Sequence, residues 1–95
     1  MIVFLLLLFT SLAFAQEPLT ETRVLRDVRI EMRDGVKLAA DVYQPGSGAE
    51  RRPTLIARTP YNRAGLRRDA EWFAQHGFAF VAVDVRGRFE SEGPF

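Results

Sequence analysis

Several residue types that could define a function are missing from the sequence, or nearly so. It contains no cysteine, which excludes disulfide bonds and thiolate metal ligands, and its one histidine, His76, cannot form a zinc site that needs two. Neither a dinucleotide-binding glycine fingerprint nor a phosphate-binding P-loop is present. Charge is nearly balanced, because 13 Lys and Arg residues meet 12 Asp and Glu residues for a net charge of +1. We therefore expect no nucleic-acid partner.

Charged side chains are also absent from the first 16 residues, where only the terminal amine is positive. Thirteen of the first fifteen residues are apolar, and the run ends on Ala13-Phe14-Ala15, a small-x-small pattern that signal peptidases accept. A helix of this length would span roughly 22 Å, which is less than the ~30 Å hydrocarbon core of a membrane. We predict a signal peptide over 1–15, cleaved before Gln16, with export to the periplasm or the extracellular space. No stable membrane span is expected after cleavage.

Alternating hydrophobicity begins after a polar stretch that we interpret as a linker over 16–23. From Val24 to Met32, and again from Val36 to Val42, apolar and charged residues largely alternate, which is typical of half-buried strands. Between these runs stands Asp34-Gly35, a pair that accepts the positive φ angles of a two-residue type I′ turn. The pattern predicts an antiparallel hairpin.

The rest of the chain has the pattern of a parallel strand–helix–strand unit. Thr54–Ala57 and Phe78–Val83 are continuous apolar runs, as expected for strands covered on both faces. Between them, helical spacing puts four residues on one face: Leu66, Ala70, Phe73 and Ala74. Gly77 stands where a left-handed C-terminal cap belongs, so the helix should end at His76. This order predicts a right-handed crossover and an α/β fold, with the hairpin feeding a parallel sheet.

Two segments follow the two apolar runs, residues 58–63 and 84–95. In open α/β sheets, catalytic groups gather beyond the carboxyl ends of parallel strands. In the first segment, Tyr61 could offer its hydroxyl to a developing oxyanion, although packing is the commoner role of such a loop tyrosine. In the second, the charges from Asp84 onward predict a solvated loop with an Asp–Arg bridge that organises the strand end.

The residues alone provide no complete catalytic set. Ser91 lacks the flanking glycines of a G-x-S-x-G nucleophile elbow, so we do not expect a nucleophile there. His76 fits a partner of the helix dipole, or a surface residue, better than a general base.

Four blocks stand in a fixed order along residues 26–95: Met32–Pro45, Arg58–Tyr61, Phe73–Val81, and Asp84–Arg88 with Ser91-Glu92-Gly93. This ordered set resembles the opening of the X-Pro dipeptidyl-peptidase/cocaine esterase (CocE/NonD) family of serine hydrolases. Phe89 departs from the pattern, since many members have a small residue there, often glycine.

The resemblance implies the N-terminal portion of an α/β-hydrolase fold over residues 24–95, acting on a small acyl ester or peptide substrate. Tyr61 matches the family tyrosine that donates its hydroxyl to the oxyanion hole. The nucleophilic serine, aspartate and histidine of the family lie further along the chain and are absent from this sequence. We therefore expect a truncated portion that is inactive by itself. No metal or organic cofactor is implied.

Two other interpretations stay open: a nonfunctional remnant, or a small exported binding module. A downstream G-x-S-x-G elbow would favour the hydrolase. The sequence does not distinguish an esterase from a dipeptidyl peptidase, and it does not indicate the oligomeric state.

Overall fold

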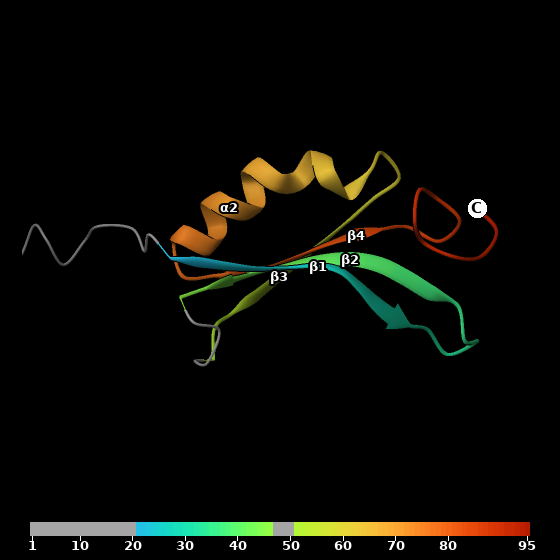
Figure 1. The fold of residues 1–95 in the computed structure, drawn as a ribbon, viewed down its shortest axis with the longest axis horizontal. Coiled ribbons are helices and arrows are strands. Elements are labelled where there is room, and N and C mark those ends of the chain that lie inside the picture. Colours follow the sequence, from blue (N-terminus) through green and yellow to red (C-terminus); the bar gives the residue numbers. More distant parts are fainter. Residues whose placement is uncertain (1–20, 47–50) are drawn as a thin grey trace, which may run out of the picture.

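The computed structural model describes residues 21–46 and 51–95. The predicted signal peptide and residues 16–20 of the predicted linker lie outside these residues. Along the chain the elements are β1 (Thr22–Glu31), β2 (Lys37–Pro45), β3 (Thr54–Thr59), the 3₁₀ helix η1 (Arg63–Leu66), α2 (Arg67–Gln75) and β4 (Ala79–Asp84) (Figure 1). Neither described range contains a helix long and apolar enough to cross a bilayer.

The strands form one four-stranded sheet in the order β1-β2-β4-β3. The β1–β2 and β2–β4 pairs are antiparallel, and β3 pairs parallel with β4. Helix α2 lies over one face of the sheet (Figure 1). The predicted α/β architecture is confirmed, because a hairpin stands beside a parallel strand–helix–strand unit with β4 in a central position.

The turn of the hairpin differs from the prediction. Gly35 N donates to the Met32 carbonyl at 3.0 Å, and Met32 N donates to the Val36 carbonyl at 2.8 Å. Gly35 has a φ of 85°, but Asp34 is not among the residues with positive φ, which a type I′ turn would require. Instead, the Asp34 carboxylate accepts a hydrogen bond from Val36 N at 3.1 Å. The connection is therefore a three-residue loop over 33–35, closed partly by a side chain.

Strand β3 is less covered than its apolar run predicts. It lies at the sheet edge and pairs only with β4 in the described part of the chain. Ala57 packs against the apolar cluster beneath α2, whereas Ile56 is 66% exposed because alternate residues of a strand point to opposite faces. The prediction of a strand covered on both faces is wrong here, because an apolar run does not indicate whether neighbouring elements cover it.

At the N-terminal end, β1 begins at Thr22, two residues before the predicted start. Thr22 pairs with Pro45, so the ladder extends to the end of β2 and into the predicted linker.

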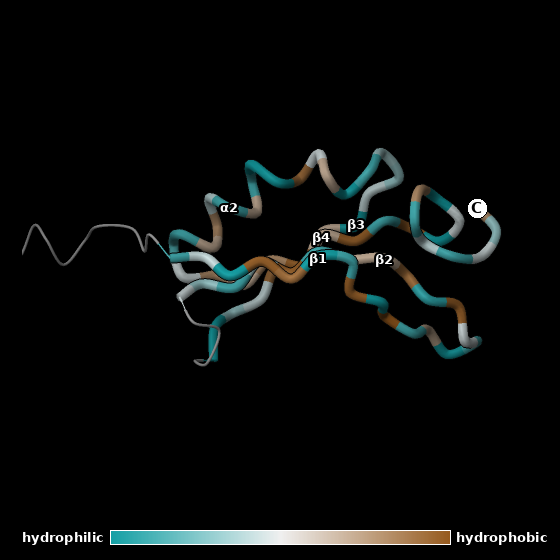
Figure 2. The backbone as a smooth tube through the Cα atoms, viewed as in Figure 1, coloured by the Kyte–Doolittle hydropathy of each residue, from teal (hydrophilic) through white to brown (hydrophobic). Residues whose placement is uncertain are grey.

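The larger core cluster lies between α2 and the sheet. It consists of Tyr43, Ala70, Ala74, Phe80 and Ala82, with Phe73 packed against it. The two alanines let the helix approach the strands closely. Figure 2 shows hydrophobic stretches along the middle of the strands, whereas hydrophilic and hydrophobic residues alternate along α2.

The C-terminal cap of α2 matches the prediction. Phe78 N donates to the Phe73 carbonyl at 3.0 Å, and Gly77 N donates to the Ala74 carbonyl at 3.2 Å. Gly77 has a φ of 91° and His76 is the C-cap residue, so α2 ends at Gln75 in a Schellman motif, one residue before the predicted end. The Phe73 and Phe78 rings, 6.0 Å apart, supply the apolar contact that accompanies this motif.

Candidate active site

The two candidate segments leave the sheet side by side. Thr59, the last residue of β3, stands opposite Asp84, the last residue of β4. Val85 N donates to the Thr59 carbonyl at 3.2 Å, and Arg88 Nε donates to the Pro60 carbonyl at 3.1 Å. The segment after β4 therefore holds the start of the turn after β3, as the parallel pairing predicts.

Tyr61 stands on this turn with its side chain in solvent. Its backbone N–H donates to Thr59 Oγ1 at 3.0 Å, and the residue is 82% exposed. The next residue, Asn62, has φ 88° and ψ 120°, and its side-chain oxygen accepts a hydrogen bond from Ala64 N at 3.1 Å. A residue with a side chain in this positive-φ conformation costs about 1–3 kcal/mol, and the conformation persists only where surrounding contacts hold it. The turn thus presents a phenolic hydroxyl at the carboxyl edge of the sheet.

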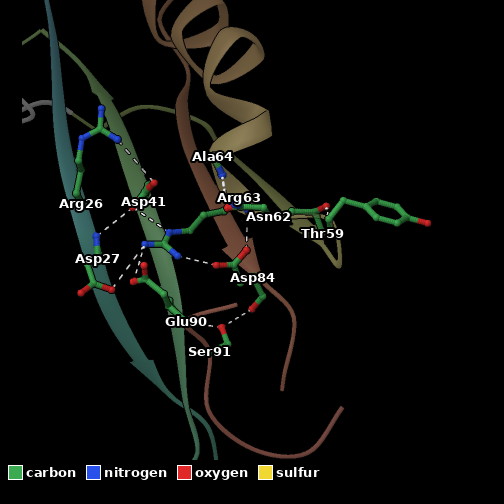
Figure 3. A network of polar contacts seen from close by, with 12 residues as sticks. Arg26, Asp27, Asp41, Thr59, Asn62, Arg63, Ala64, Asp84, Glu90 and Ser91 are labelled. Carbon is green, nitrogen blue, oxygen red and sulfur yellow. Dashed lines mark hydrogen bonds and ion pairs between the residues drawn. The ribbon is translucent and has the colours of Figure 1, made fainter. Parts of the chain in front are cut away.

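Arg63 occupies the centre of a buried polar network (Figure 3). Its backbone N–H donates to Asp84 Oδ1 at 2.7 Å, and its Nη1 donates to Asp84 Oδ2 at 2.6 Å. Its Nε donates to Asp41 Oδ1 at 3.1 Å. Asp84 is fully buried and Asp41 nearly so, which explains why both carboxylates need the guanidinium.

Strand β1 reaches the same network through a bulge. The β1–β2 register shifts between Leu25 and Val28, and Asp27 has a φ of 55°. This conformation lets Asp27 N donate to Asp41 Oδ1 at 3.0 Å, and it puts Asp27 Oδ1 3.7 Å from Arg63 Nη2 (Figure 3). The bulge therefore brings β1 into contact with groups from β2 and from the turn after β3.

The charge of Arg63 is strongly stabilised. Burial by itself would lower the pKa of Arg63, but hydrogen bonds to Asp84 and Asp41 outweigh it and raise the pKa above its ordinary value. Removing one partner of such a buried ion pair leaves an uncompensated charge, which typically lowers the free energy of unfolding by about 3–5 kcal/mol. The network therefore favours one arrangement of the three residues.

The hydroxyl of Ser91 is held by two backbone groups. Its Oγ donates to the Asp84 carbonyl at 2.6 Å and accepts from Ala39 N at 2.8 Å, and the residue is buried. His76 lies before the start of β4, whereas Ser91 follows its end, and His76 Nδ1 lies 2.7 Å from the Trp72 carbonyl. The structure therefore keeps the serine away from the histidine, and Ser91 joins β2 to the last loop.

The segment from Asp84 onward was predicted to be a solvated loop with an Asp–Arg bridge at the strand end. The loop is largely exposed and such a bridge is present, but Asp84 itself is fully buried and its partner Arg63 belongs to the other segment. Arg86, nearer in sequence, pairs instead with exposed Asp34 at 2.8 Å. Sequence reasoning missed Arg63 and Asp41. The available signal was a carboxylate at the end of a buried run, since buried charges are normally paired.

Comparisons with known proteins agree with the fold. A model of the X-Pro dipeptidyl-peptidase (S15) family matches residues 34–95. The chain is 40% identical over 78 residues to the cocaine esterase of Rhodococcus sp. (strain MB1 Bresler), covering 76% of this chain and 13% of that protein.

Two solved structures are similar to it as well. An alpha-amino acid ester hydrolase has a TM-score of 0.58 and 30% identity over 78% of this chain and 14% of its own. A CocE/NonD family hydrolase from Staphylococcus aureus has a TM-score of 0.63 and 20% identity over 76% of this chain and 16% of its own. The chain thus spans only a small part of the length of each of these proteins.

Proposed function

Because the chain belongs to the X-Pro dipeptidyl-peptidase (S15) family, we propose that it is the N-terminal portion of a serine hydrolase. This hydrolase would cleave small acyl esters or peptides through an acyl-enzyme, with its triad beyond the end of this chain. The observation that carries the proposal is Tyr61, whose exposed hydroxyl stands on a fixed turn at the carboxyl edge of the sheet.

In this proposal the hydroxyl of Tyr61 acts as an oxyanion donor. When the serine of the complete enzyme attacks the substrate carbonyl, the carbonyl oxygen becomes negative and accepts a hydrogen bond from the tyrosine. The tyrosine keeps its proton throughout. A donor held in advance by the backbone needs no reorganisation at that moment, which is the source of its effect on rate.

Replacing Tyr61 tests the proposal. In the product of the complete reading frame, Tyr61→Phe should lower kcat for a p-nitrophenyl ester by about 10²–10³-fold, with little change in KM, because the bond forms in the transition state. Tyr43→Phe is the matched control, since Tyr43 is buried in the core and should leave kcat unchanged. An unaltered kcat in Tyr61→Phe would contradict the proposed role.

We also propose that the protein is exported, on the basis of its apolar leader and the Ala13-Phe14-Ala15 pattern. N-terminal sequencing of the product recovered outside the cytoplasm should begin at Gln16. Retention of the intact leader on a cytoplasmic product would contradict export.

A further inference from the structure

The turn that carries Tyr61 is fastened at both ends. On one side, Arg88 Nε binds the Pro60 carbonyl at 3.1 Å. On the other, both the backbone N–H and the guanidinium of Arg63 bind the carboxylate of Asp84, at 2.7 and 2.6 Å. Only Tyr61 and Asn62 lie between these attachment points. The position of the Tyr61 backbone relative to β4 is therefore set by the hydrogen bonds at Pro60 and Arg63.

Arg63 is the stronger of the two attachments because it contacts several carboxylates at once. Its Nη1 binds Asp84, its Nε binds Asp41 at 3.1 Å, and its Nη2 lies 3.4 Å from Glu90 Oε2. These partners come from β4, from β2 and from the loop after β4 (Figure 3). A guanidinium has donors in a planar fork that can serve different acceptors, whereas a lysine ammonium is a single point charge. The geometry is thus specific to arginine.

The backbone beside Arg63 also needs external support. Asn62 has a φ of 88°, a conformation that a residue with a side chain rarely adopts unless its surroundings hold it there. Its own side chain caps Ala64 N, but the chain direction after Asn62 is fixed by the bond from Arg63 N to Asp84. The Arg63 guanidinium holds the Asp84 carboxylate in place for that bond through Nη1 at 2.6 Å. Without the guanidinium, the carboxylate and Asn62 would be free to relax, and the Tyr61 backbone would move with them.

From these contacts we infer that Arg63, bound to Asp84 and Asp41, is a positioning residue that fixes the Tyr61 hydroxyl for its role as oxyanion donor. The inference rests on the proposed function of Tyr61. Arg63 itself acts through the backbone of the turn and need not touch the substrate.

The first test measures amide hydrogen exchange in the full chain and needs no activity. Arg63→Lys keeps the positive charge but loses the fork, so the Tyr61 amide should exchange about tenfold faster or more, while the Ala82 amide at the centre of β4 stays protected. Arg67→Lys is the matched control, because it alters an exposed Arg–Glu pair on α2 and should change neither amide. Faster exchange at both amides would mean that Arg63 stabilises the whole sheet, and it would overturn the inference. No change at either amide would also overturn it.

The second test is a double-mutant cycle in the product of the complete reading frame. Arg63→Lys should lower kcat with little change in KM, and it should have no further effect in a Tyr61→Phe background, because it acts through that hydroxyl. Equal losses in both backgrounds would overturn the inference while leaving the role of Tyr61 intact. A Tyr61→Phe variant with normal kcat would instead contradict the proposed function, so the two failures are distinguishable.

Discussion

The two tyrosines of the chain have opposite surroundings. Tyr43 is fully buried beneath α2, and its hydroxyl has no hydrogen-bond partner within the described ranges. Tyr61 is 82% exposed on a turn whose backbone is held from both sides. An exposed hydroxyl on a fixed turn can donate to a ligand, whereas a buried hydroxyl without a partner contributes only its desolvation penalty. At the residue scale, this contrast is why the proposed oxyanion donor is Tyr61.

The buried hydroxyl of Tyr43 leads to a prediction about pH. Burial raises the pKa of Tyr43 above its ordinary value of 10.0. The folded state therefore holds the phenolic proton more tightly than the unfolded state, and its stability should be lost as pH rises above that value. Tyr43→Phe should be at least as stable as the unaltered chain at neutral pH, because it removes that desolvation penalty, and it should abolish the tyrosine-linked alkaline loss. Urea unfolding followed by Trp72 fluorescence, at about pH 8 and about pH 11, measures both effects. An equal alkaline loss in the variant would contradict this account.

The roles of single residues were only partly predictable from the sequence. Tyr61 was found because its motif resembles a family, and position alone favoured a packing role. Asp84 was assigned to a solvated loop, although its place at the end of an apolar run could have indicated a buried charge. Its partner Arg63 is 21 residues away and joins it only through the parallel pairing of β3 and β4. Asp41 was missed because an aspartate in an alternating strand resembles an ordinary solvent-facing residue.

At the scale of elements, local chemistry decided which predictions succeeded. The end of α2 was predictable because Gly77 supplies the positive φ of the cap within one turn of the helix. The hairpin was predictable from alternation, but its turn type was not, because the Asp34 carboxylate competes for Val36 N. The exposure of β3 depends on its neighbours in space, which periodicity does not report.

Glycine substitutions test the helix cap. Gly77 has a φ of 91°, and a Cβ there would meet only an ordinary contact, so Gly77→Ala should lower the free energy of unfolding by about 1–2 kcal/mol through backbone strain alone. Gly65 has no positive φ and open space around it, so Gly65→Ala should be neutral or stabilise by about 0.4–1 kcal/mol. Urea midpoints give both values. Equal effects of the two substitutions would show that the cap is not the source of the difference.

At the scale of the whole molecule, β3 is an exposed edge strand of the sheet. Ile56 on β3 is 66% exposed, and β3 has a single partner strand among the described residues. The proteins that the chain matches are much longer, since it covers 13% of the cocaine esterase and 14% of the ester hydrolase. Both facts agree with the proposal that the chain is the N-terminal portion of a longer protein, because further polypeptide would cover β3.

The 95-residue chain by itself should be inactive. Its one histidine and its one described serine lie beyond opposite ends of β4, and the Ser91 hydroxyl is buried with two backbone partners. The chain should therefore neither hydrolyse p-nitrophenyl esters nor react with a fluorophosphonate probe at Ser91. Mass spectrometry of the probed chain checks the second point, and covalent labelling of Ser91 would contradict this reading of the site.

The nucleotide sequence that follows the Phe95 codon tests whether the chain is the N-terminal portion of a serine hydrolase. We predict that the same frame continues into a G-x-S-x-G elbow, followed by candidate aspartate and histidine residues in that order. A stop codon directly after Phe95, with no such elbow in any frame, would contradict the hydrolase and favour a remnant or a small binding module.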